Sequence, residues 1–299
     1  MKVLCIGHAS YDITFPIESF IIENTKNRVN EKIECGGGPA SNAAYLLGIY
    51  GIETYFMGLI GDDYYANKIL KEFEKVNVNT KYLLKDNNYK TTVSTIFANK
   101  SNGSRTILTY KDNQKSYPII DIDLEPDVIL IDGQEPEISK YMINKHKKAI
   151  SIIDAGRNTP EIIELAQMVN YLVCSKEFAE SITGITIEFN NQKTLNDIYI
   201  MMEQQFKNTI VITLEDKGCL YKINDTIKLM PSIKVKAIDS TGAGDLFHGA
   251  FVYGIVKKFN LEKILKISNI VGALSVTKIG GRNSVPTKEE VKKIYANFE

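Results

Sequence analysis

The sequence predicts an α/β fold with a doubly wound, mostly parallel sheet flanked by helices and a small antiparallel β lid. Short, continuous apolar runs alternate with segments of helical periodicity, which is typical of a parallel sheet buried on both faces. Two further stretches lack helical periodicity and are rich in β-forming residues. With 299 residues the chain is long enough to bury a sizeable core in one large domain.

The apolar runs are expected to form the strands of the main sheet. They cover residues 2–7, 53–61, 127–133, 149–156, 171–175 and 209–215. Apolar residues at helical spacing predict helices over residues 39–51, 62–78, 246–258 and 262–278, with a final helix from Thr287. Pro39 suits the first turn of its helix, and Gly51 follows the end of it. Thr287 and Glu290 have capping-box spacing.

The two β-rich stretches cover about residues 11–34 and 88–113. The second contains the segment "NKSNGS", whose polar residues and glycine are typical of a hairpin turn. Together the stretches are expected to form a small antiparallel sheet that projects from the main domain. We interpret this extension as a lid over a site at the carboxyl edge of the parallel sheet.

The composition excludes several classes of function. Lys and Arg total 36, as do Asp and Glu, so the near-zero net charge argues against a nucleic acid partner. No run of 18 apolar residues suggests a membrane span, and the apolar stretch in "MKVLCIGHAS" is too short for a signal peptide. The cysteines are scattered without metal-like spacing, which favours reduced thiols in a cytoplasmic protein: Cys5, Cys35, Cys174 and Cys219.

A glycine-rich turn, "DSTGAGD", precedes the apolar helix expected from residue 246. The backbone amides of Gly242, Ala243 and Gly244 are suited to bind an anion at the positive end of that helix. A carboxylate in the same turn makes sense if Asp245 accepts a proton from a hydroxyl while the amides stabilise a transferring phosphoryl group. The alternative is that Asp245 only caps the helix. A Walker P-loop is excluded because the chain contains no GxxxxGK[ST].

A second cluster, "CGGGPASNAAYLLG", places three glycines before the helix expected at 39–51. A dinucleotide fingerprint would require G-x-G-x-x-G after the first strand, and here the glycines follow "NEKIE" instead. A flexible hinge with Asn42 bonded to substrate hydroxyls fits better. The alternative for Asn42 is a solvated position on the helix. The missing fingerprint argues against a dehydrogenase.

Together the two clusters resemble the signatures of the PfkB, or ribokinase-like, family of sugar kinases. The family's GGxxxN motif appears at residues 37–42 and its DTxGAGD motif at residues 239–245. The resemblance covers essentially the whole chain and implies a single ribokinase-like kinase domain over residues 1–299. It also implies ATP-dependent phosphorylation of a hydroxymethyl group, with Mg²⁺ as a cofactor and Asp245 as the base.

The resemblance assigns further residues to the sugar site. Asp12, Gly37, Gly38 and Asn42 match its sugar-binding positions, and Gln134 lies near another. The alternative for Asp12 is a turn residue at the end of a strand. Arg105 lies in the expected hairpin, where its planar guanidinium suits a phosphate or sulfonate at the far end of a sugar. The alternative for Arg105 is an exposed cross-strand position.

On the ATP side, Thr213 matches a family threonine that precedes a glycine-containing loop. Glu215 stands where the family usually has glycine, Gly218 follows in the same loop, and Asn269 is expected on the adenine side. The chain departs from the family at the N-x-x-E motif linked to Mg²⁺ and phosphate. Ser175 occupies the Asn position, and Glu177 offers only a shifted carboxylate.

The family often binds a monovalent cation, such as K⁺, beside its anion hole. Asp239 and Thr241 match that site, as do Gly280 and Ser284 in the loop "KIGGRNSVP". A cage of main-chain oxygens at this place would suit a hard cation. The histidines carry no such assignment, and His8 and His248 are expected to have ordinary packing or hydrogen-bonding roles.

Several functions therefore remain open. The segments "DLFHGAF" and "GGRNSVP" look most like those of fructose-type and sulfofructose kinases, with a ribokinase or a nucleoside kinase as close alternatives. A non-catalytic nucleotide sensor is the rival of a different class, although a sensor has no need of the base Asp245. The expected partner is a small sugar, and a homodimer through the lid is a further expectation.

Overall fold

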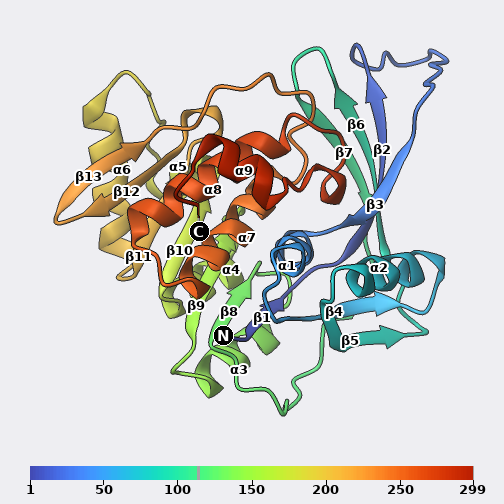
Figure 1. Ribbon diagram of the computed structural model, residues 1–299, viewed down its shortest axis with the longest axis horizontal. Helices are drawn as coiled ribbons and strands as arrows, with labels where there is room; N and C mark the ends of the chain where they lie inside the picture. Colours follow the sequence, from blue (N-terminus) through green and yellow to red (C-terminus); the bar gives the residue numbers. More distant parts are fainter. Residues whose placement is uncertain (113–114, 299) are drawn as a thin grey trace.

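A central sheet of nine strands forms the middle of the molecule (Figure 1). The computed structural model describes residues 1–112 and 115–298. The strands of this sheet are β1 (Val3–Ile6), β4 (Thr54–Gly61), β5 (Asn79–Asp86), β8 (Val128–Ile131), β9 (Ile150–Ala155), β10 (Tyr171–Ser175), β11 (Thr209–Thr213), β12 (Cys219–Ile223) and β13 (Thr226–Met230). Their order is β13-β12-β11-β10-β9-β8-β1-β4-β5.

The pairing confirms the predicted mostly parallel sheet. All neighbours from β5 through β4, β1, β8, β9 and β10 to β11 run parallel. At the other edge β12 and β13 are antiparallel, and neither strand was predicted from the sequence. β1 lies between β8 and β4, with Val3 in register with Val128 and Thr54. The carboxyl ends of the central strands therefore meet along one edge of the sheet.

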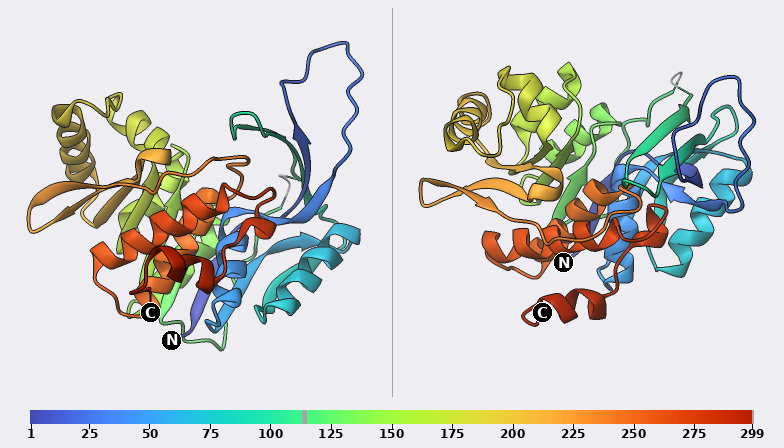
Figure 2. Two further views of the ribbon diagram at one scale, coloured as in Figure 1. Left: turned by 45° about the horizontal axis from the view of Figure 1, so that its top comes forward. Right: turned by 90° about the horizontal axis from the view of Figure 1, so that it is seen from above.

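Helices cover both faces of the central sheet (Figure 2). One face carries α1 (Pro39–Ile49), α2 (Tyr64–Lys75), α7 (Ala243–Val256), α8 (Leu261–Ser275) and α9 (Lys288–Ile294). The other face carries α3 (Pro136–Lys145), α4 (Pro160–Met168), α5 (Lys176–Thr183) and α6 (Gln192–Gln205). Each layer of helices encloses its own hydrophobic core, so the strands between them are buried on both sides.

The starts of α1 and α9 follow the expected local chemistry, but several helix bounds differ from the prediction by up to three residues. α2 lies inside the predicted range 62–78. Pro39 is the first residue of α1, and the capping box at the start of α9 is present. α7 begins three residues before the predicted start at residue 246 and ends at Val256, two residues before the predicted end. α8 ends at Ser275 and not at residue 278. All these differences lie at helix termini, where periodicity carries least information.

A separate four-stranded sheet projects from the β4–β5 side of the molecule (Figures 1 and 2). It consists of β2 (Ser10–Ile17), β3 (Ile33–Gly37), β6 (Thr92–Asn99) and β7 (Arg105–Tyr110), in the order β3-β2-β6-β7. β3 and β7 pair antiparallel with their neighbours, and β2 and β6 run parallel to each other.

β6 and β7 fall in the predicted lid segment 88–113, and β2 falls in the segment of about 11–34. β3 begins at the end of that first segment and extends beyond it to Gly37. We call this sheet the lid. Residue 113, the last of the predicted lid segments, and residue 299 lie outside the described residues. The treatment of residues 1–299 as one domain stays a prediction. Within residues 1–112 and 115–298, no helix is long and apolar enough to cross a membrane.

Candidate active site

A cleft of about 700 Å³ lies between the lid and the carboxyl ends of β1, β8 and β9. The starts of α1 and α7 also border it. Its ionisable lining combines four carboxylates with three cationic side chains: Asp12, Asp132, Asp154, Asp245, Arg105, Lys111 and Arg157. The cleft brings together eight of the predicted site residues, namely Asp12, Gly38, Asn42, Arg105, Gln134, Thr241, Gly242 and Asp245.

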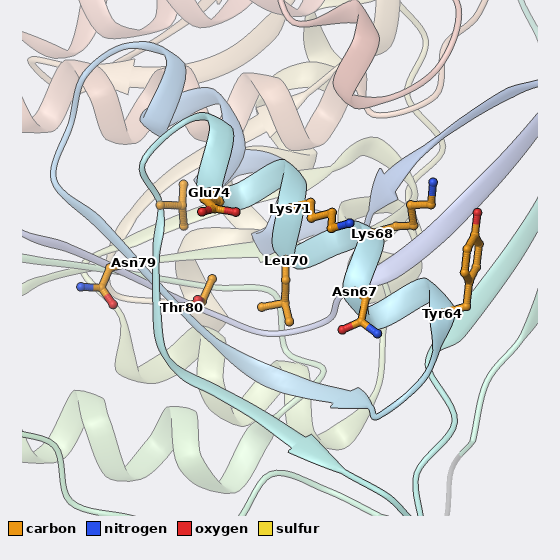
Figure 3. A pocket seen from close by; sticks show the side chains of 9 residues that line it. Tyr64, Asn67, Lys68, Leu70, Lys71, Glu74, Asn79 and Thr80 are labelled. Carbon is orange, nitrogen blue, oxygen red and sulfur yellow. The ribbon is translucent and has the colours of Figure 1, made fainter.

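A second cleft, of about 760 Å³, lies on the outer side of α2 (Figure 3). Side chains of α2 and of the first residues of β5 line it, including Lys68, Lys71 and Asn79. None of the predicted site residues contributes to this lining. Size therefore does not distinguish the two clefts, and the converging carboxylates mark the first one as the candidate active site.

The glycine-rich turn before α7 opens into the candidate active site. Gly242 is the N-cap of α7 and has a φ of 78°, a left-handed conformation that glycine adopts without a steric penalty. Asp245 lies in the first turn, and its carboxylate accepts a hydrogen bond of 2.7 Å from Nδ2 of Asn42. The N-cap position belongs to Gly242, so the interpretation of Asp245 as a helix cap is wrong.

α1 and α7 approach each other closely, which brings Asn42 to Asp245. A Cβ at Gly249 would lie only 3.1 Å from the Cα of Ala43, so a larger residue there would push the helices apart. Asn42 is buried, and its Oδ1 atom has no hydrogen-bond partner among the described residues. The alternative of a solvated Asn42 is therefore wrong. A buried amide oxygen without a partner is the kind of acceptor that a ligand hydroxyl satisfies.

Gly37 and Gly38, two of the three consecutive glycines before α1, leave room for atoms of the sugar-side wall. A Cβ at Gly37 would lie 2.1 Å from the Asp12 carboxylate, and one at Gly38 would lie 2.3 Å from the backbone oxygen of His8. Gly38 also has a φ of 96°. These two predicted residues therefore shape the site through the absence of a side chain.

Gly36 makes room for a buried arginine that sequence reasoning missed. A Cβ at Gly36 would lie 2.4 Å from the guanidinium of Arg282, which donates to Glu72 at 2.8 Å and to the hydroxyl of Ser41. Glu72 also accepts a 2.8 Å hydrogen bond from the backbone nitrogen of Gly36. The loop before α9 is thereby fastened to the start of α1. No local pattern announces these contacts, because Arg282 and Glu72 are 210 residues apart.

Burial and mutual repulsion shift the pKa values of the carboxylates in the cleft. Burial raises the pKa of Asp12 to about 6, and the negative charge of Asp245 adds to that rise. A 2.9 Å hydrogen bond from Ser10 and the positive charge of Arg282 oppose it. Burial also raises the pKa of Asp245, and the hydrogen bond from Asn42 opposes that rise. Carboxylates with raised pKa values in a cleft are typical of binding and proton-transfer sites.

Asp132, which sequence reasoning also missed, holds three segments of the site together. It follows β8, and its carboxylate accepts hydrogen bonds from the backbone nitrogens of His8, Ala40 and Gln134 at 2.8, 3.2 and 3.0 Å. Because Ala40 is in the first turn of α1, this carboxylate places a negative charge at the amino-terminal end of the helix, where such a charge is stabilising. A carboxylate directly after an apolar strand was the signal that could have found it.

The predicted residues Gln134 and Arg105 both engage neighbours within the cleft. Oε1 of Gln134 accepts a 2.7 Å hydrogen bond from Nζ of Lys111. Arg105, at the start of β7, donates a 2.9 Å hydrogen bond to the hydroxyl of Ser240 in the glycine-rich turn. Arg105 is therefore more than an exposed cross-strand residue, because it connects the lid to the turn.

The residues predicted for ATP lie outside the lining of the cleft. Thr213 ends β11 and donates to the backbone oxygen of Cys174 at 3.2 Å. Glu215 has a φ of 53°, so it adopts the left-handed conformation for which the family's glycine is suited. Gly218 and Asn269 both approach the backbone oxygen of Met230: a Cβ at Gly218 would lie 1.9 Å from it, and Asn269 donates to it at 3.2 Å.

The residues predicted for a monovalent cation form a buried group beside the turn. Asp239 accepts hydrogen bonds from the backbone nitrogens of Thr241 and Gly280 at 2.9 and 2.8 Å. Ser284 donates to the backbone oxygen of Gly281 at 2.7 Å. In the described part of the chain the buried hydroxyl oxygen of Thr241 has no hydrogen-bond partner. One carboxylate and an unpartnered hydroxyl suit a singly charged hard cation.

The positions of the missing N-x-x-E motif have other functions. Ser175 is the N-cap of α5, and its hydroxyl accepts a 3.1 Å hydrogen bond from the backbone nitrogen of Phe178. Glu177 is exposed in the first turn of that helix. Across the described residues, no group of three or more His, Cys, Asp or Glu side chains is placed to hold a metal ion. These residues therefore do not fit a protein-held Mg²⁺.

A family model described as pfkB family carbohydrate kinase matches residues 1–288. The chain belongs to the pfkB family of carbohydrate kinases. The resemblance seen in the two glycine motifs is thereby confirmed. As a pfkB family kinase, the chain is a phosphotransferase that acts on a hydroxyl group.

Individual relatives of this pfkB family kinase differ in their substrates. A ribokinase of Staphylococcus aureus is 27% identical over 98% of this chain and 99% of its own length. A nucleoside kinase of Methanocaldococcus jannaschii is 23% identical over 97% of this chain and 95% of its own length. The structure of Arabidopsis thaliana ribokinase complexed with ribose and ATP has a TM-score of 0.81 at 23% identity, covering 98% of this chain and 97% of that one. That likeness confirms the ribokinase fold.

Proposed function

We propose that this pfkB family kinase transfers the γ-phosphoryl group of ATP to a hydroxymethyl group of a sugar, with Asp245 as the general base. The observation that carries the proposal is the position of the Asp245 carboxylate. It lies in the first turn of α7, lines the cleft and is held at 2.7 Å by Asn42. A hydroxyl bound in front of it loses its proton to Asp245 as it attacks the phosphorus.

The same turn supplies the anion hole in this proposal. The amides of Gly242, Ala243 and Gly244 belong to the N-cap and first residues of α7, where the helix dipole favours negative charge. A Cβ at Gly244 would meet no atom within 4 Å, so the turn leaves open space for a phosphoryl group at that point. Stabilisation of the transferring group and acceptance of the proton thus come from one turn.

The sugar occupies the cleft between this turn and the lid. Asp12 and Asn42 accept hydrogen bonds from its hydroxyls, and Gln134 contacts it from the loop after β8. Gly37 and Gly38 leave the room for Asp12 and for the backbone at His8. We favour a fructose-type ketose or sulfofructose on the resemblance of "DLFHGAF" and "GGRNSVP", with ribose or a nucleoside as the alternatives that the relatives' names support.

Arg105 bears on whether that sugar carries an anionic group. Its guanidinium lines the cleft together with Lys111 and Arg157. A phosphate or sulfonate at the far end of the sugar would find bidentate donors there. The bond from Arg105 to Ser240 is compatible with this function, since a guanidinium offers five N–H donors.

ATP binds beside this cleft, at the end of β11. Thr213, Glu215, Gly218 and Asn269 form its proposed site, and the convergence of Gly218 and Asn269 on Met230 supports their grouping. The Arabidopsis relative with bound ATP has the same fold. Mg²⁺ accompanies the phosphates of ATP in this proposal, and the chain's residues at the motif of Ser175 and Glu177 do not hold it.

A monovalent cation, for which K⁺ is the first candidate, is held by Asp239, Thr241, Gly280 and Ser284 in this proposal. The unpartnered hydroxyl of Thr241 supports the assignment. When bound, the ion supplies positive charge next to the turn that receives the phosphoryl group. The protein's own contribution is the Asp239 carboxylate, which fixes the turn to the loop at Gly280.

A homodimer through the lid completes the proposal. All six residues of the edge strand β7 are exposed, including Leu108 at 70% and Tyr110 at 63%. An exposed apolar edge strand favours pairing with another chain. Sedimentation of the intact chain tests this part, with Leu108→Lys expected to give a monomer. A monomer in the unmodified chain would contradict it.

The experiment that tests the proposed function is ADP formation on a panel of acceptors. The panel contains fructose, sulfofructose, ribose and nucleosides, with Asp245→Asn as the matched control. We expect ADP with one class of sugar and strong loss in the variant. Nucleotide binding without ADP formation on any acceptor would support the rival sensor function instead.

A further inference from the structure

His248 lies next to the proposed catalytic turn and has no part in the function described so far. It is on α7, one helical turn after Gly244, and its side chain is only 4% exposed. Nδ1 lies 2.7 Å from the backbone oxygen of Gly244, and Nε2 lies 3.1 Å from the backbone oxygen of Val173. From its sequence, this residue was expected to have an ordinary packing or hydrogen-bonding role.

The partners of the ring decide which protonation state fits. Both carbonyl oxygens are acceptors, and Nδ1 also lies 3.2 Å from the carboxylate of Asp154. A neutral imidazole donates from one nitrogen only, so its other nitrogen would direct a lone pair at an oxygen. An imidazolium donates from both nitrogens and satisfies both carbonyls and the carboxylate. The geometry therefore favours the charged ring.

Asp154 is the natural counter-ion for that ring. It lies on β9, lines the same cleft as Asp245, and its side chain is 17% exposed. Burial raises its pKa to about 6, an effect that the charge of His248 opposes and the charges of Asp245 and Asp132 reinforce. Near neutral pH the carboxylate is thus mostly ionised, and Nδ1 of His248 lies 3.2 Å from it.

We propose that Asp154 and His248 form a buried carboxylate–imidazolium pair that positions the Gly244–Asp245 peptide and the base Asp245 for phosphoryl transfer. His248 and Asp154 are positioning residues in this proposal, because they act through Asp245 and the turn. Donation from Nδ1 to the oxygen of Gly244 fixes the peptide that carries the backbone nitrogen of Asp245. The inference rests on the proposed function of Asp245 as the base.

The charge of the pair also acts on Asp245. A positive His248 lowers the pKa of Asp245 and so favours its ionised, proton-accepting form. The other ionisable groups facing this region include Asp12 on β2, Asp132 after β8, Cys174 on β10 and Arg105 on β7. Arg105 acts in the same direction as His248, whereas Asp132 repels Asp154. Loss of the imidazolium removes a positive charge that opposes the rise in the pKa of Asp245.

The protonation state is testable without any substrate, because the chain has only three histidines. Histidine ring nitrogens are labelled with ¹⁵N and observed by NMR in the intact protein at about pH 7.5, above the reference pKa of about 6.5. His8 gives a neutral ring, since burial and the charges of Lys111 and Arg157 lower its pKa to about 3. The variant His146→Gln removes the signal of the third histidine. His146 lies at the end of α3, and its ring contacts Glu125.

Of the two rings that remain, His8 and His248, we expect His248 to carry protons on both nitrogens. In Asp154→Asn we expect a single protonated nitrogen at the same pH. A neutral His248 in the unmodified protein would overturn the proposal, whether or not the variants fold. A ring that stays doubly protonated in Asp154→Asn would overturn the assignment of Asp154 as its counter-ion.

The kinetic arm tests the positioning role. In His248→Gln we expect kcat to fall about tenfold with little change in KM for ATP, and the acidic limb of the rate profile to move to higher pH by up to about one unit. His146→Gln is the matched control and leaves both unchanged. An unshifted profile in His248→Gln overturns the positioning role. Full turnover in Asp245→Asn would overturn the proposed base and leave the NMR result standing, so the two failures are distinguishable.

Discussion

Nδ2 of Asn42 donates a 2.7 Å hydrogen bond to the carboxylate of Asp245, across 203 residues of sequence. Each residue belongs to one of the two glycine motifs, so this bond joins the halves of the proposed active site. It depends on the close crossing of α1 and α7 at Gly249. The two motifs therefore act as one unit, in which the first orients the base that the second supplies.

Replacement of Asn42 by Ala tests that unit. We expect kcat to fall about 10- to 100-fold, because the base loses its orienting partner. The hydrogen bond from Asn42 lowers the pKa of Asp245, so its loss raises that pKa and moves the acidic limb of the rate profile to higher pH. The measurement is kcat against pH. A lower rate with an unshifted acidic limb would contradict the account.

Replacement of Asp12 by Asn is expected to stabilise the free protein at alkaline pH. The pKa of Asp12 is raised to about 6 in the folded chain, so its contribution to stability is present below the unfolded value of about 4 and is lost as the pH rises through about 6. The gain in the free energy of unfolding is about 1 to 3 kcal/mol at about pH 8 and near zero at about pH 4.

Urea unfolding at the two pH values measures this difference. The matched control is Asp62→Asn at an exposed ion pair with Lys85, expected to change stability by less than about 0.5 kcal/mol. The same Asp12 variant is expected to raise KM for the sugar. Equal stability of Asp12→Asn and the parent chain at alkaline pH would contradict the prediction, because the buried, ionised carboxylate would then not destabilise the folded chain.

Replacement of Arg105 by Gln tests the charge of the substrate. With an anionic sugar we expect KM to rise about tenfold or more, from the loss of a charge-assisted bond worth about 1.5 to 3 kcal/mol. With a neutral sugar the change is small. Arg28→Gln, at an exposed residue between β2 and β3, is the control. The protein would instead be a fructokinase or a ribokinase if it turned over a neutral sugar as well as any anionic one and if neither variant changed KM.

Replacement of Thr241 by Val tests the monovalent cation. We expect the activity of the parent chain to be higher in K⁺ than in a bulky organic cation at constant ionic strength. The variant keeps the shape of the side chain but loses the unpartnered hydroxyl, so its response to K⁺ should be smaller. Initial rates in the two salts give the comparison. Identical rates in both salts for the parent chain would refute the site.

The sequence predicts those parts of this molecule that depend on local chemistry. Continuous apolar runs identify the buried parallel strands, and the capping box at Thr287 fixes the start of α9. The antiparallel pair β12–β13 was missed, although Asn224 and Asp225 both adopt a positive φ in the turn between them, as a tight hairpin requires. That short polar turn was a usable signal.

The rest of the site depends on contacts between distant residues. Asp132 and Asp154 both lie at the carboxyl ends of apolar strands, but only the fold shows that one serves α1 and the other faces His248. Arg282 gives no local sign of its buried bond to Glu72. Such partners are set by how helices and strands pack, and sequence spacing carries no record of it.

The most direct test of the central claim is the turnover of Asp245→Asn. The substitution removes the proton acceptor while keeping an amide of nearly the same shape beside Asn42. The account predicts normal binding of ATP and sugar, with kcat lower by about 10²- to 10⁴-fold. Near-normal kcat in a folded variant that binds both ligands would contradict the account.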